Sequence, residues 1–327
     1  MEKKYKTICI LIICYKQQEL IKRAINSLLQ QKEYGLHRIV VCDDCSPDDT
    51  WKVLQEYKKR FPDLMCIYRN DENIGIYKNL EKVTSLRGDS DLYSYLAGDD
   101  EYCDGFFKAL QEYILDHDID FSKPIGFYGD YKGITPNGQV FLKKQDVVKD
   151  KNLNLFRLYI RGYVSGRSCF VNNPVLEKFT TTIYDKGLNL AESFYDSQKH
   201  RYIEDAHYIN SIGNIYYTNI GVSKELRFTP YHKEEAITKW LYFIEKLIDN
   251  KTDVRYAYAE IYRAQFLISP TWLLYIKTLF YLLTSGYPSI PSFKYCRTFV
   301  SPMKHFVLQK YEKNRIGAFI AGIIYKL

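Results

Sequence analysis

In the first hundred residues, short apolar runs typical of strands alternate with segments whose apolar residues recur at helical spacing. Residues 8–15 form a continuous apolar run rich in Ile, typical of a strand buried on both faces, and residues 18–31 then place Leu and Ile at helical spacing. Further strands are predicted over 37–42, 65–68 and 92–97, and helices from Ser46 and over 76–86. Because strands and helices alternate at this spacing, the pattern predicts an α/β fold of right-handed βαβ units with a mostly parallel sheet.

The later chain changes character. A strand is expected over 125–131, and Pro136-Asn-Gly138 is a turn signal leading to a second strand over 139–142. From Lys233 onward the pattern is helical, with Leu241, Ile244 and Leu247 on one face. We therefore expect a catalytic domain over residues 1–230 and a helical region over 231–327.

Two helix starts are predicted from capping residues. Ser46 is expected to cap the second helix, with Pro47 in its first turn and Asp49 completing a start that resembles a capping box. In the helical region, Ser269 and Pro270 are expected to open an apolar helix that runs to Leu283.

Carboxylates follow two of the predicted strands. Asp43 and Asp44 come after the second strand, and Asp99 and Asp100 come after the fourth. In open parallel sheets, ligands bind outside these carboxyl ends. Adjacent aspartates repel each other, and Mg²⁺ or Mn²⁺ is commonly held by one or two carboxylates plus substrate phosphates. Each pair alone would more often cap a helix or lie in a solvated loop, but two pairs at equivalent strand ends favour a metal-dependent site.

The turn after the first strand excludes the two commonest nucleotide-binding classes that begin with a βαβ unit. Residues 14–17 read Cys-Tyr-Lys-Gln and contain no glycine. A dinucleotide-binding or P-loop protein would carry its glycine-rich phosphate loop at this point. The Gly- and Arg-rich loop of a nucleotidyltransferase is also missing, so that class stays a weaker alternative.

Four ordered motifs resemble those of family 2 glycosyltransferases, which have the GT-A fold. They are residues 7–15, Ile39-Val-Val-Cys-Asp-Asp-Cys-Ser-Pro-Asp-Asp-Thr50, Asn73-Ile-Gly75 with Asn79, and Ala97-Gly-Asp-Asp100. The resemblance is clear to about residue 130, thinner to about 225, and does not extend into the helical tail. It implies a Rossmann-like mixed, mostly parallel sheet flanked by helices.

The resemblance also implies a reaction and its residues. A nucleotide-diphosphate sugar, often a UDP-sugar, would be attacked directly at the anomeric carbon with inversion, with a Mg²⁺ or Mn²⁺ ion as a Lewis acid. The residues implied in donor and metal binding are Ile13 and Tyr15 as pocket walls, Asp44 toward the base, Lys78 near the diphosphate, and Asp99 and Asp100 at the metal, with Asp100 the direct ligand. Lys78 is equally well explained as a lysine on a helix surface.

A base must take the proton from the acceptor hydroxyl. Glu204-Asp205 resembles the family's ED motif, so Asp205 is predicted as the base, with Glu204 as its alternative. The competing interpretation is an acid-rich helix start, which any helix favours.

The chain departs from the family pattern at several positions. Lys16 replaces the usual Asn and Cys45 the usual Gly, and the Arg and His segment often seen after the ED motif is not evident in residues 217–223. His232, later in the chain, is only a weak candidate for the histidine of that segment. These departures put the fine geometry of the site in doubt more than the reaction class.

Three further motifs are weighed as alternatives. Cys42 and Cys45 form a CxxC between which two acids lie, a poor context for redox or zinc chemistry. Residues 198–202 resemble the QxxRW of processive synthases but precede the ED motif, so transfer of a single sugar is favoured. Arg167 resembles the acceptor side of the family site, or equally a structural ion-pair partner.

Composition bears on partners and location. The net charge is +7, 31 Tyr and 18 Phe make the chain rich in aromatic residues, and eight Cys suit a reducing cytoplasm. No uninterrupted run of apolar residues is long enough for a conventional span. The apolar segments 269–283 and 316–327 would either pack on the catalytic domain or a second subunit, or dock on the inner membrane leaflet.

These observations predict a metal-dependent, inverting glycosyltransferase acting on a glycan or lipid-linked glycan precursor. No nucleic-acid partner is expected. The alternative from another class is a nucleotide-sugar-binding protein without transfer activity, which would keep Asp44, Asp99 and Asp100 but would not need Asp205. The donor sugar and the acceptor are not determined by the sequence.

Overall fold

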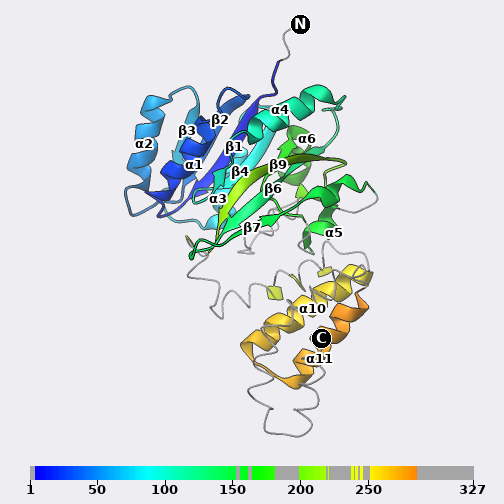
Figure 1. Cartoon of the computed structure of the whole chain (residues 1–327). Helices are drawn as coiled ribbons and strands as arrows, with labels where there is room; N and C mark the ends of the chain where they lie inside the picture. Colours follow the sequence, from blue (N-terminus) through cyan, green and yellow to red (C-terminus); the bar gives the residue numbers. More distant parts are fainter. Residues whose placement is uncertain are drawn as a thin grey trace. The chain divides into compact units, whose positions relative to one another are not determined.

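The structure is a computed structural model of the 327-residue chain (Figure 1). It describes residues 4–151, 155–160, 164–180, 199–218, 220, 237–238, 240–241, 244–245 and 251–285. The chain divides into two compact units, residues 1–224 and 225–327, and each is described by itself. The predictions made for Gln198, His232, Leu247 and residues 316–327 lie outside the described residues.

The first unit alternates strands and helices as predicted. Its elements are β1 (Ile8–Cys14), α1 (Leu20–Leu29), β2 (Leu36–Asp43), α2 (Thr50–Arg60), β3 (Met65–Arg69), α3 (Ile76–Ser85), β4 (Leu92–Ala97), β5 (Glu101–Tyr102), α4 (Phe106–Asp116), β6 (Ile125–Ile134), β7 (Val140–Lys143), the 3₁₀ turn η1 (Asp146–Lys149), α5 (Leu155–Ile160), β8 (Cys169–Asn172), α6 (Asn173–Thr180) and β9 (Asp205–Tyr217).

The described strands form one mixed sheet. Its order is β3-β2-β1-β4-β8-β6-β9-β5, and β7 pairs with β6 off this path. The pairs β1–β2, β1–β4, β2–β3 and β6–β9 are parallel, whereas β8, β5 and β7 run antiparallel to their neighbours. The carboxyl ends of β1, β2 and β4 therefore meet at one rim, and the predicted α/β fold with a mostly parallel sheet is confirmed.

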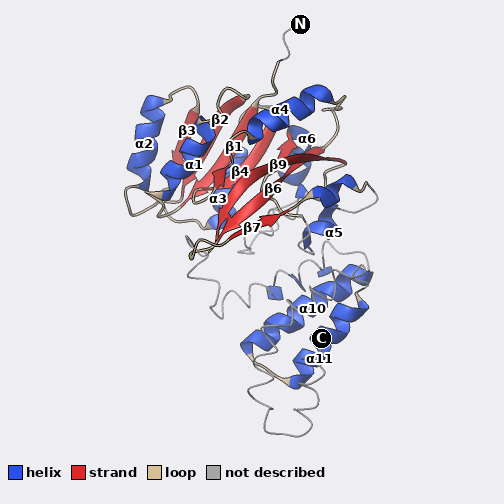
Figure 2. Ribbon diagram, viewed as in Figure 1, coloured by secondary structure: helices blue, strands red, loops and turns tan. Residues whose placement is uncertain are grey.

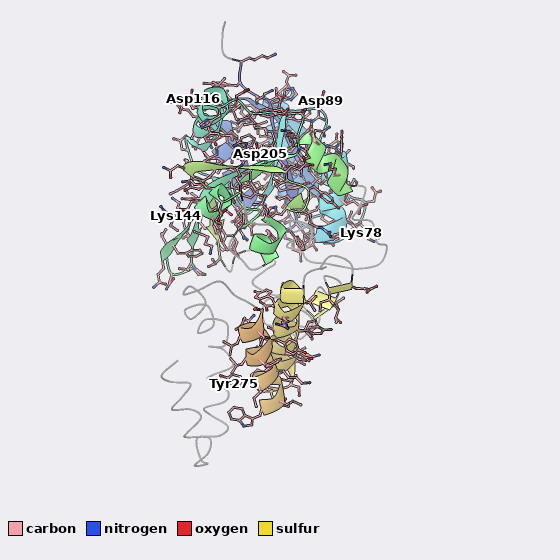
Figure 3. All side chains as sticks on the ribbon, turned by 90° about the vertical axis from the view of Figure 1, so that its right-hand side faces the viewer. Lys78, Asp89, Asp116, Lys144, Asp205 and Tyr275 are labelled. Atoms are coloured by element: carbon pink, nitrogen blue, oxygen red, sulfur yellow. The ribbon has the colours of Figure 1, made fainter. Side chains whose placement is uncertain are left out.

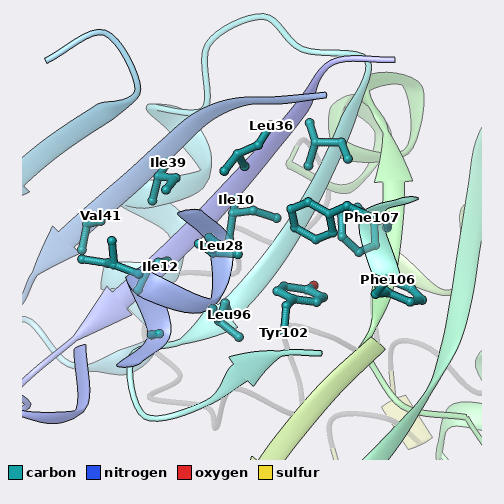
Figure 4. Close-up of a cluster of buried hydrophobic side chains, with 14 of the residues drawn as sticks. Ile10, Ile12, Leu28, Leu36, Ile39, Val41, Leu96, Tyr102, Phe106 and Phe107 are labelled. Atoms are coloured by element: carbon teal, nitrogen blue, oxygen red, sulfur yellow. The ribbon is translucent and has the colours of Figure 1, made fainter. Parts of the chain in front are cut away.

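Helices cover both faces of this sheet (Figure 2). In β1, Ile8, Ile10 and Ile12 pack into one core with side chains of α1, α2 and α4, whereas Cys9 and Leu11 pack into a second core with side chains of α3 and α6. Figure 4 shows part of the first core, where Tyr102 and the two Phe side chains at the start of α4 lie against the sheet. A strand between two apolar cores cannot alternate polar and apolar residues, which explains the unbroken apolar run of β1.

The predicted start of α2 is wrong by three residues, because Asp49 and not Ser46 stands at the cap position. The helix begins at Thr50, and Ser46 does not cap it. The Ser46 hydroxyl donates instead to Oδ1 of Asp43, and the Thr50 N–H donates to Oδ1 of Asp48 at 3.1 Å. The Ser46 oxygen accepts from the Lys16 N–H at 3.0 Å instead of from an N–H of the helix.

The described part of the second unit contains two paired helices, α10 (Lys251–Ile268) and α11 (Trp272–Thr284). The rings of Phe266 and Tyr275 lie 6.1 Å apart, centroid to centroid. The predicted cap at Ser269 is wrong, because Thr271 caps α11 by accepting from the Leu274 N–H at 3.3 Å. Among the described residues, no helix has the length and apolar character needed to cross a membrane.

Candidate active site

Three strand ends are tied together at the carboxyl rim of the sheet. The Asp44 N–H donates to the Cys14 carbonyl at 2.9 Å, and the Gly98 N–H donates to the Ile13 carbonyl at 3.3 Å. A Cβ on Gly98 would lie 2.2 Å from Oε1 of Gln17 and 3.1 Å from Cβ of Cys14, so the junction is closely packed. The half-buried side chains of Ile13 and Tyr15, the predicted pocket walls, lie at this rim.

Asp44 organises the loop that precedes α3. Its Oδ1 accepts from Asn70 Nδ2 at 2.8 Å and from the Ile74 N–H at 2.9 Å, and its Oδ2 accepts from the Gly75 N–H at 2.9 Å. An ionised carboxylate offers about four acceptor positions, so the three bonds leave capacity for one further donor. Asp44 therefore joins two of the sequence motifs physically, a role that the sequence did not reveal.

The support around Asp44 extends through Asn70. Asn70 also donates to Oδ1 of Asn79 at 3.1 Å, and Asn79 donates to the Cys42 carbonyl at 3.1 Å. Lys82 donates to Oδ1 of Asn70 at 2.7 Å. Asn79 belongs to a recognised motif, but Asn70 stands alone after β3 and carried no signal in the sequence.

Asp43 points away from Asp44, because successive side chains of a strand face opposite sides. It is fully buried, accepts from the Ser46 side chain and N–H, and pairs with Arg69 Nε at 3.4 Å. Burial raises the pKa of Asp43 above its ordinary value, although the bonds from Ser46 and the charge of Arg69 act against this. Asp43 holds the turn in shape.

Asp99 and Asp100 follow β4 at the same rim. Asp100 is 5% exposed, and its Oδ1 accepts from the Tyr217 N–H at 3.2 Å. Burial raises the pKa of Asp99 above its ordinary value, even though the guanidinium groups of Arg23 and Arg167 lower it. An ionised Asp99 thus lacks sufficient compensating positive charge from its surroundings.

Side chains from α1 and β9 hold the loop that carries these carboxylates. Arg23 Nη2 donates to the Asp99 carbonyl at 2.5 Å, its Nε lies 3.1 Å from Oε1 of Glu101, and its guanidinium carbon lies 3.7 Å from the centre of the Tyr217 ring. The Tyr217 hydroxyl donates to Glu101. Burial, together with this bond, raises the pKa of Tyr217 to about 12. Neither Arg23 nor Tyr217 belongs to a motif, so sequence reasoning missed both.

The residues at this rim fit a divalent cation. Asp99 and Asp100 supply hard carboxylate oxygens, and the raised pKa of Asp99 shows a carboxylate that a cation would stabilise in its ionised form. The described residues include no group of three His, Cys, Asp or Glu able to enclose a metal. Two carboxylates complete a Mg²⁺ or Mn²⁺ site when substrate phosphates and water supply the other oxygens.

Lys78 and Arg167 are the two cationic side chains that the sequence analysis links to the site. Lys78 is exposed in the first turn of α3 and lies at the lower edge of the first unit in Figure 3. The guanidinium carbon of Arg167 lies 3.7 Å from the Tyr216 ring centre, and its charge lowers the pKa of Asp99. Arg167 is thus close enough to act electrostatically on the predicted metal site.

Asp205 lies far from that site. It is the first residue of β9, paired with Ile125, whereas Tyr217 at the last position of β9 contacts Asp100. On the partner strand β6, nine steps of about 3.3 Å separate Ile125 and Ile134, which pair with these two ends of β9. Figure 3 places Asp205 and Lys78 at different levels of the first unit. The structure thus does not bring Asp205 next to Asp100, and the role of Asp205 as the base stays a prediction.

Glu204 and Asp205 have other partners at their end of β9. Oδ1 of Asp205 lies 2.5 Å from Lys151 Nζ and its Oδ2 lies 2.9 Å from His207 Nε2, while Glu204 pairs with Lys178 at 2.7 Å. Burial would raise the pKa of Asp205, but Lys151 and His207 outweigh it and hold the pKa below its ordinary value. Asp205 opens a strand, so the alternative interpretation of these acids as a helix start is wrong.

The two departures from the family pattern share one backbone conformation. Lys16 has φ 55° and Cys45 has φ 56°, both in the left-handed region. Asn and Gly, the usual family residues, adopt this region more readily than Lys or Cys. Cys42, the other half of the CxxC, is buried in β2, and burial raises the pKa of its thiol to about 12. Lys16 and Cys45 thus hold a backbone conformation for which they are less suited than Asn or Gly.

Comparison with known protein families identifies the family of this chain. The family model described as Glycosyl transferase family 2 matches residues 9–178, just over half of the chain. The chain belongs to glycosyl transferase family 2. The matched residues contain the ends of β1, β2 and β4, and therefore Asp44, Asp99 and Asp100, but they stop before Glu204 and Asp205.

Curated relatives of this family 2 chain include two mycoplasma proteins. The processive diacylglycerol beta-glycosyltransferase of Mycoplasma genitalium is 29% identical over 176 residues, which cover 53% of this chain and 46% of that protein. Its counterpart from Mycoplasma pneumoniae is 28% identical over 119 residues, covering 36% and 34%. The chain thus spans less than half the length of these relatives.

Solved structures share the fold. S. aureus TarS 1-349 in complex with UDP-GlcNAc superposes with a TM-score of 0.57 at 13% identity, covering 84% of this chain and 79% of that one. The mannosyltransferase PcManGT from Pyrobaculum calidifontis, in complex with GDP-Man and Mn²⁺, has a TM-score of 0.51 at 12% identity, covering 98% and 85%. The predicted GT-A fold is confirmed.

Proposed function

We propose that this protein transfers a single sugar from a nucleotide-diphosphate sugar, most simply a UDP-sugar, to a hydroxyl of a glycan or lipid-linked glycan precursor, with inversion. The observation that carries the proposal is the convergence of Asp44, Asp99 and Asp100 at one rim of a sheet that belongs to family 2. Solved neighbours bearing UDP-GlcNAc or GDP-Man on the same fold support a donor of this class.

The residues divide the work as follows. Asp44 and the loop it holds would receive the base of the nucleotide beside Ile13 and Tyr15, and the exposed Lys78 would approach the diphosphate. Asp100, supported by Asp99, would hold Mg²⁺ or Mn²⁺. When bound, that cation supplies Lewis-acid stabilisation of the departing diphosphate. The proton released by the acceptor hydroxyl would pass to a general base. Arg23 and Tyr217 would keep both carboxylates in position throughout.

The names of the relatives support an acceptor that is linked to a lipid. The two mycoplasma relatives are named as diacylglycerol glycosyltransferases, so their acceptor carries a hydroxyl on a lipid. A lipid-linked acceptor requires that the enzyme work at a membrane surface. This supports, for the present chain, a location on the inner face of the cytoplasmic membrane.

The helical unit is suited to that location. Leu273, Ile276, Phe280 and Leu283, spaced along one face of α11, are between 58% and 69% exposed. Residues 225–327 contain 15 Lys and Arg against 8 Asp and Glu, a net +7, whereas residues 1–224 contain 31 of each. All the excess positive charge thus lies in the unit with this apolar face, which favours an anionic lipid surface over a second copy of the same charge.

Release of nucleotide diphosphate tests the proposal. The full chain should release UDP from at least one UDP-sugar when Mn²⁺ and a hydroxyl acceptor are present, and Asp100→Asn should lower the rate by at least about a hundredfold. Asp104→Asn, a carboxylate change just beyond β5, serves as the matched control. No release from any nucleotide sugar, or equal rates in Asp100→Asn, would contradict the proposal. Products with several added sugars would contradict transfer of a single sugar.

The placement of Asp205 favours a second candidate function. If no carboxylate serves as base, the chain would bind nucleotide sugars without transferring them. Such a protein would show a thermal shift with a UDP-sugar and Mn²⁺ that Asp99→Asn abolishes, but no UDP release with any acceptor. The two readouts together separate binding from transfer.

A further inference from the structure

The hairpin of β6 and β7 exposes apolar side chains on both of its faces. Val140, Phe141 and Leu142 are consecutive residues of β7, and they are 64%, 43% and 50% exposed. Alternation along the strand puts Phe141 on one face and the other two on the opposite face. Phe141 lies over Gly133, where an added Cβ would come within 1.9 Å of its ring. The hairpin thus presents a two-sided apolar edge.

The sheet register places this edge beside the candidate metal site. Glu101, next to Asp100, pairs with Ile215 of β9; Ile215 pairs with Lys132 of β6, and Lys132 pairs with Leu142. Neighbouring strands are about 4.8 Å apart, so Leu142 lies roughly 14 Å across the sheet from Glu101. A surface that meets β7 would therefore border the place where a sugar is transferred.

The positive charge of the hairpin favours a negatively charged surface as its partner. Residues 131–145 contain Lys132, Lys143 and Lys144 and no Asp or Glu. Two of these lysines, Lys143 and Lys144, directly follow the apolar residues. Apolar side chains that enter a headgroup region, beside lysines that contact anionic lipids, are the combination found in segments that lie at a membrane surface.

We infer that the β6–β7 hairpin docks on an anionic lipid surface and sets the candidate active site at headgroup level. The inference rests on the proposed function only for the acceptor, and it is independent of α11. A second copy is disfavoured as the occupant, because lysines on an edge strand, such as Lys143 of β7, hinder the pairing of two such edges.

Vesicle partition of the full chain tests the docking. Flotation with vesicles of phosphatidylglycerol and phosphatidylcholine would be compared with vesicles of phosphatidylcholine alone, without any nucleotide sugar. Lys143→Glu with Lys144→Glu should lower partition to the anionic vesicles by at least about tenfold, and Val140→Ser with Leu142→Ser should lower it as well. The matched control is Lys52→Glu with Lys59→Glu, which makes the same charge change on exposed positions of α2.

Hydrogen exchange separates the hairpin from α11 as the point of contact. Anionic vesicles should slow exchange of the amides in residues 134–144 in the wild-type chain. The inference is overturned if the hairpin variants partition like the wild type, if the α2 control loses as much, or if exchange in 134–144 is unchanged by vesicles. If exchange in residues 134–144 instead slows as the protein concentration rises without vesicles, the edge contacts a second copy. That result would also overturn the inference.

These outcomes are distinct from failure of the proposed function. Partition and exchange are measured without donor or metal, so an inactive protein can still dock. Conversely, UDP release in the absence of vesicles would persist in the hairpin variants, because no hairpin residue is assigned to the donor site.

Discussion

Oδ2 of Asp44, just after the end of β2, accepts a hydrogen bond from the Gly75 N–H at 2.9 Å, which fixes the start of α3 against the carboxyl rim of the sheet. Gly75 has φ 84°, a conformation that residues with a Cβ rarely adopt. One carboxylate thus sets the shape of the loop and leaves one acceptor position for a further donor. If Asp44 receives the nucleotide base as proposed, this residue serves both the loop and the donor.

Asp44→Asn should weaken both stability and donor binding. The amide lacks the charge and offers a single acceptor oxygen, so at least one of the three bonds to residues 70–75 is lost. Bonds to a charged group are each worth about 1.5–3 kcal/mol. We expect the free energy of unfolding to fall by about 2 kcal/mol in urea titrations, and affinity for UDP in calorimetry to fall at least about tenfold. Asp71→Asn, on the exposed part of the same loop, is the control.

Asp99→Asn should stabilise the metal-free protein at neutral pH. A carboxyl whose pKa is raised on folding opposes folding once the pH exceeds its unfolded pKa, and the full penalty is present above the folded pKa. The amide removes that penalty. The melting temperature without metal should therefore rise at pH 7 and stay unchanged near pH 3, while the upward shift caused by Mn²⁺ in the wild type should disappear. A lower melting temperature at pH 7 would contradict the assigned cause of the pKa shift.

Much of this fold could be predicted because local pattern and tertiary structure agree. The Ile-rich run of β1 is buried on both faces, and helical spacing in α1 matches its single buried face. The turn at 136–138 joins β6 to β7 as predicted. Helix starts were less predictable, because Ser46 bonds to Asp43 rather than to α2, and this choice depends on how the chain turns after β2.

The candidate site was predictable only in part. Motif spacing located the carboxylates at the ends of β2 and β4, since parallel strands bring such ends together. Arg23 and Tyr217 could not be found, because each reaches the Asp99–Asp100 loop from an element distant in sequence. The predicted role of Asp205 depended on the ED motif lying near that loop, whereas the long strand β9 carries it to the opposite end.

Restoring the family residues at the two left-handed positions should stabilise the protein. A residue with a Cβ loses about 1–2 kcal/mol in this conformation, and Asn tolerates it better. Lys16→Asn should raise the free energy of unfolding by about 0.5–1 kcal/mol, measured by urea denaturation. Cys45→Gly should give a similar gain, reduced by the greater entropy of glycine in the unfolded chain. Lys52→Gly, inside α2, is the control and should lower the free energy of unfolding, because glycine is unfavourable within a helix.

Asp205→Asn should affect stability more than catalysis. Because Lys151 and His207 hold the pKa of Asp205 below its ordinary value, its contribution to stability is present above the unfolded pKa and is lost as the pH falls through the folded pKa. The variant should be about 0.5–1 kcal/mol less stable at pH 7, a modest value because the Lys151 partner is exposed, and indistinguishable from the wild type near pH 2.

The rate of sugar transfer by the same variant decides the role of Asp205. Since Asp205 and Asp100 lie at opposite ends of β9, UDP release under saturating donor and acceptor should stay within about threefold of the wild type. Loss of a general base costs on the order of 10²–10⁴ in rate. A fall of that size, with Lys151→Met retaining activity as a control for the loss of the ion pair, would return Asp205 to the catalytic machinery and require β9 to be placed differently during the reaction.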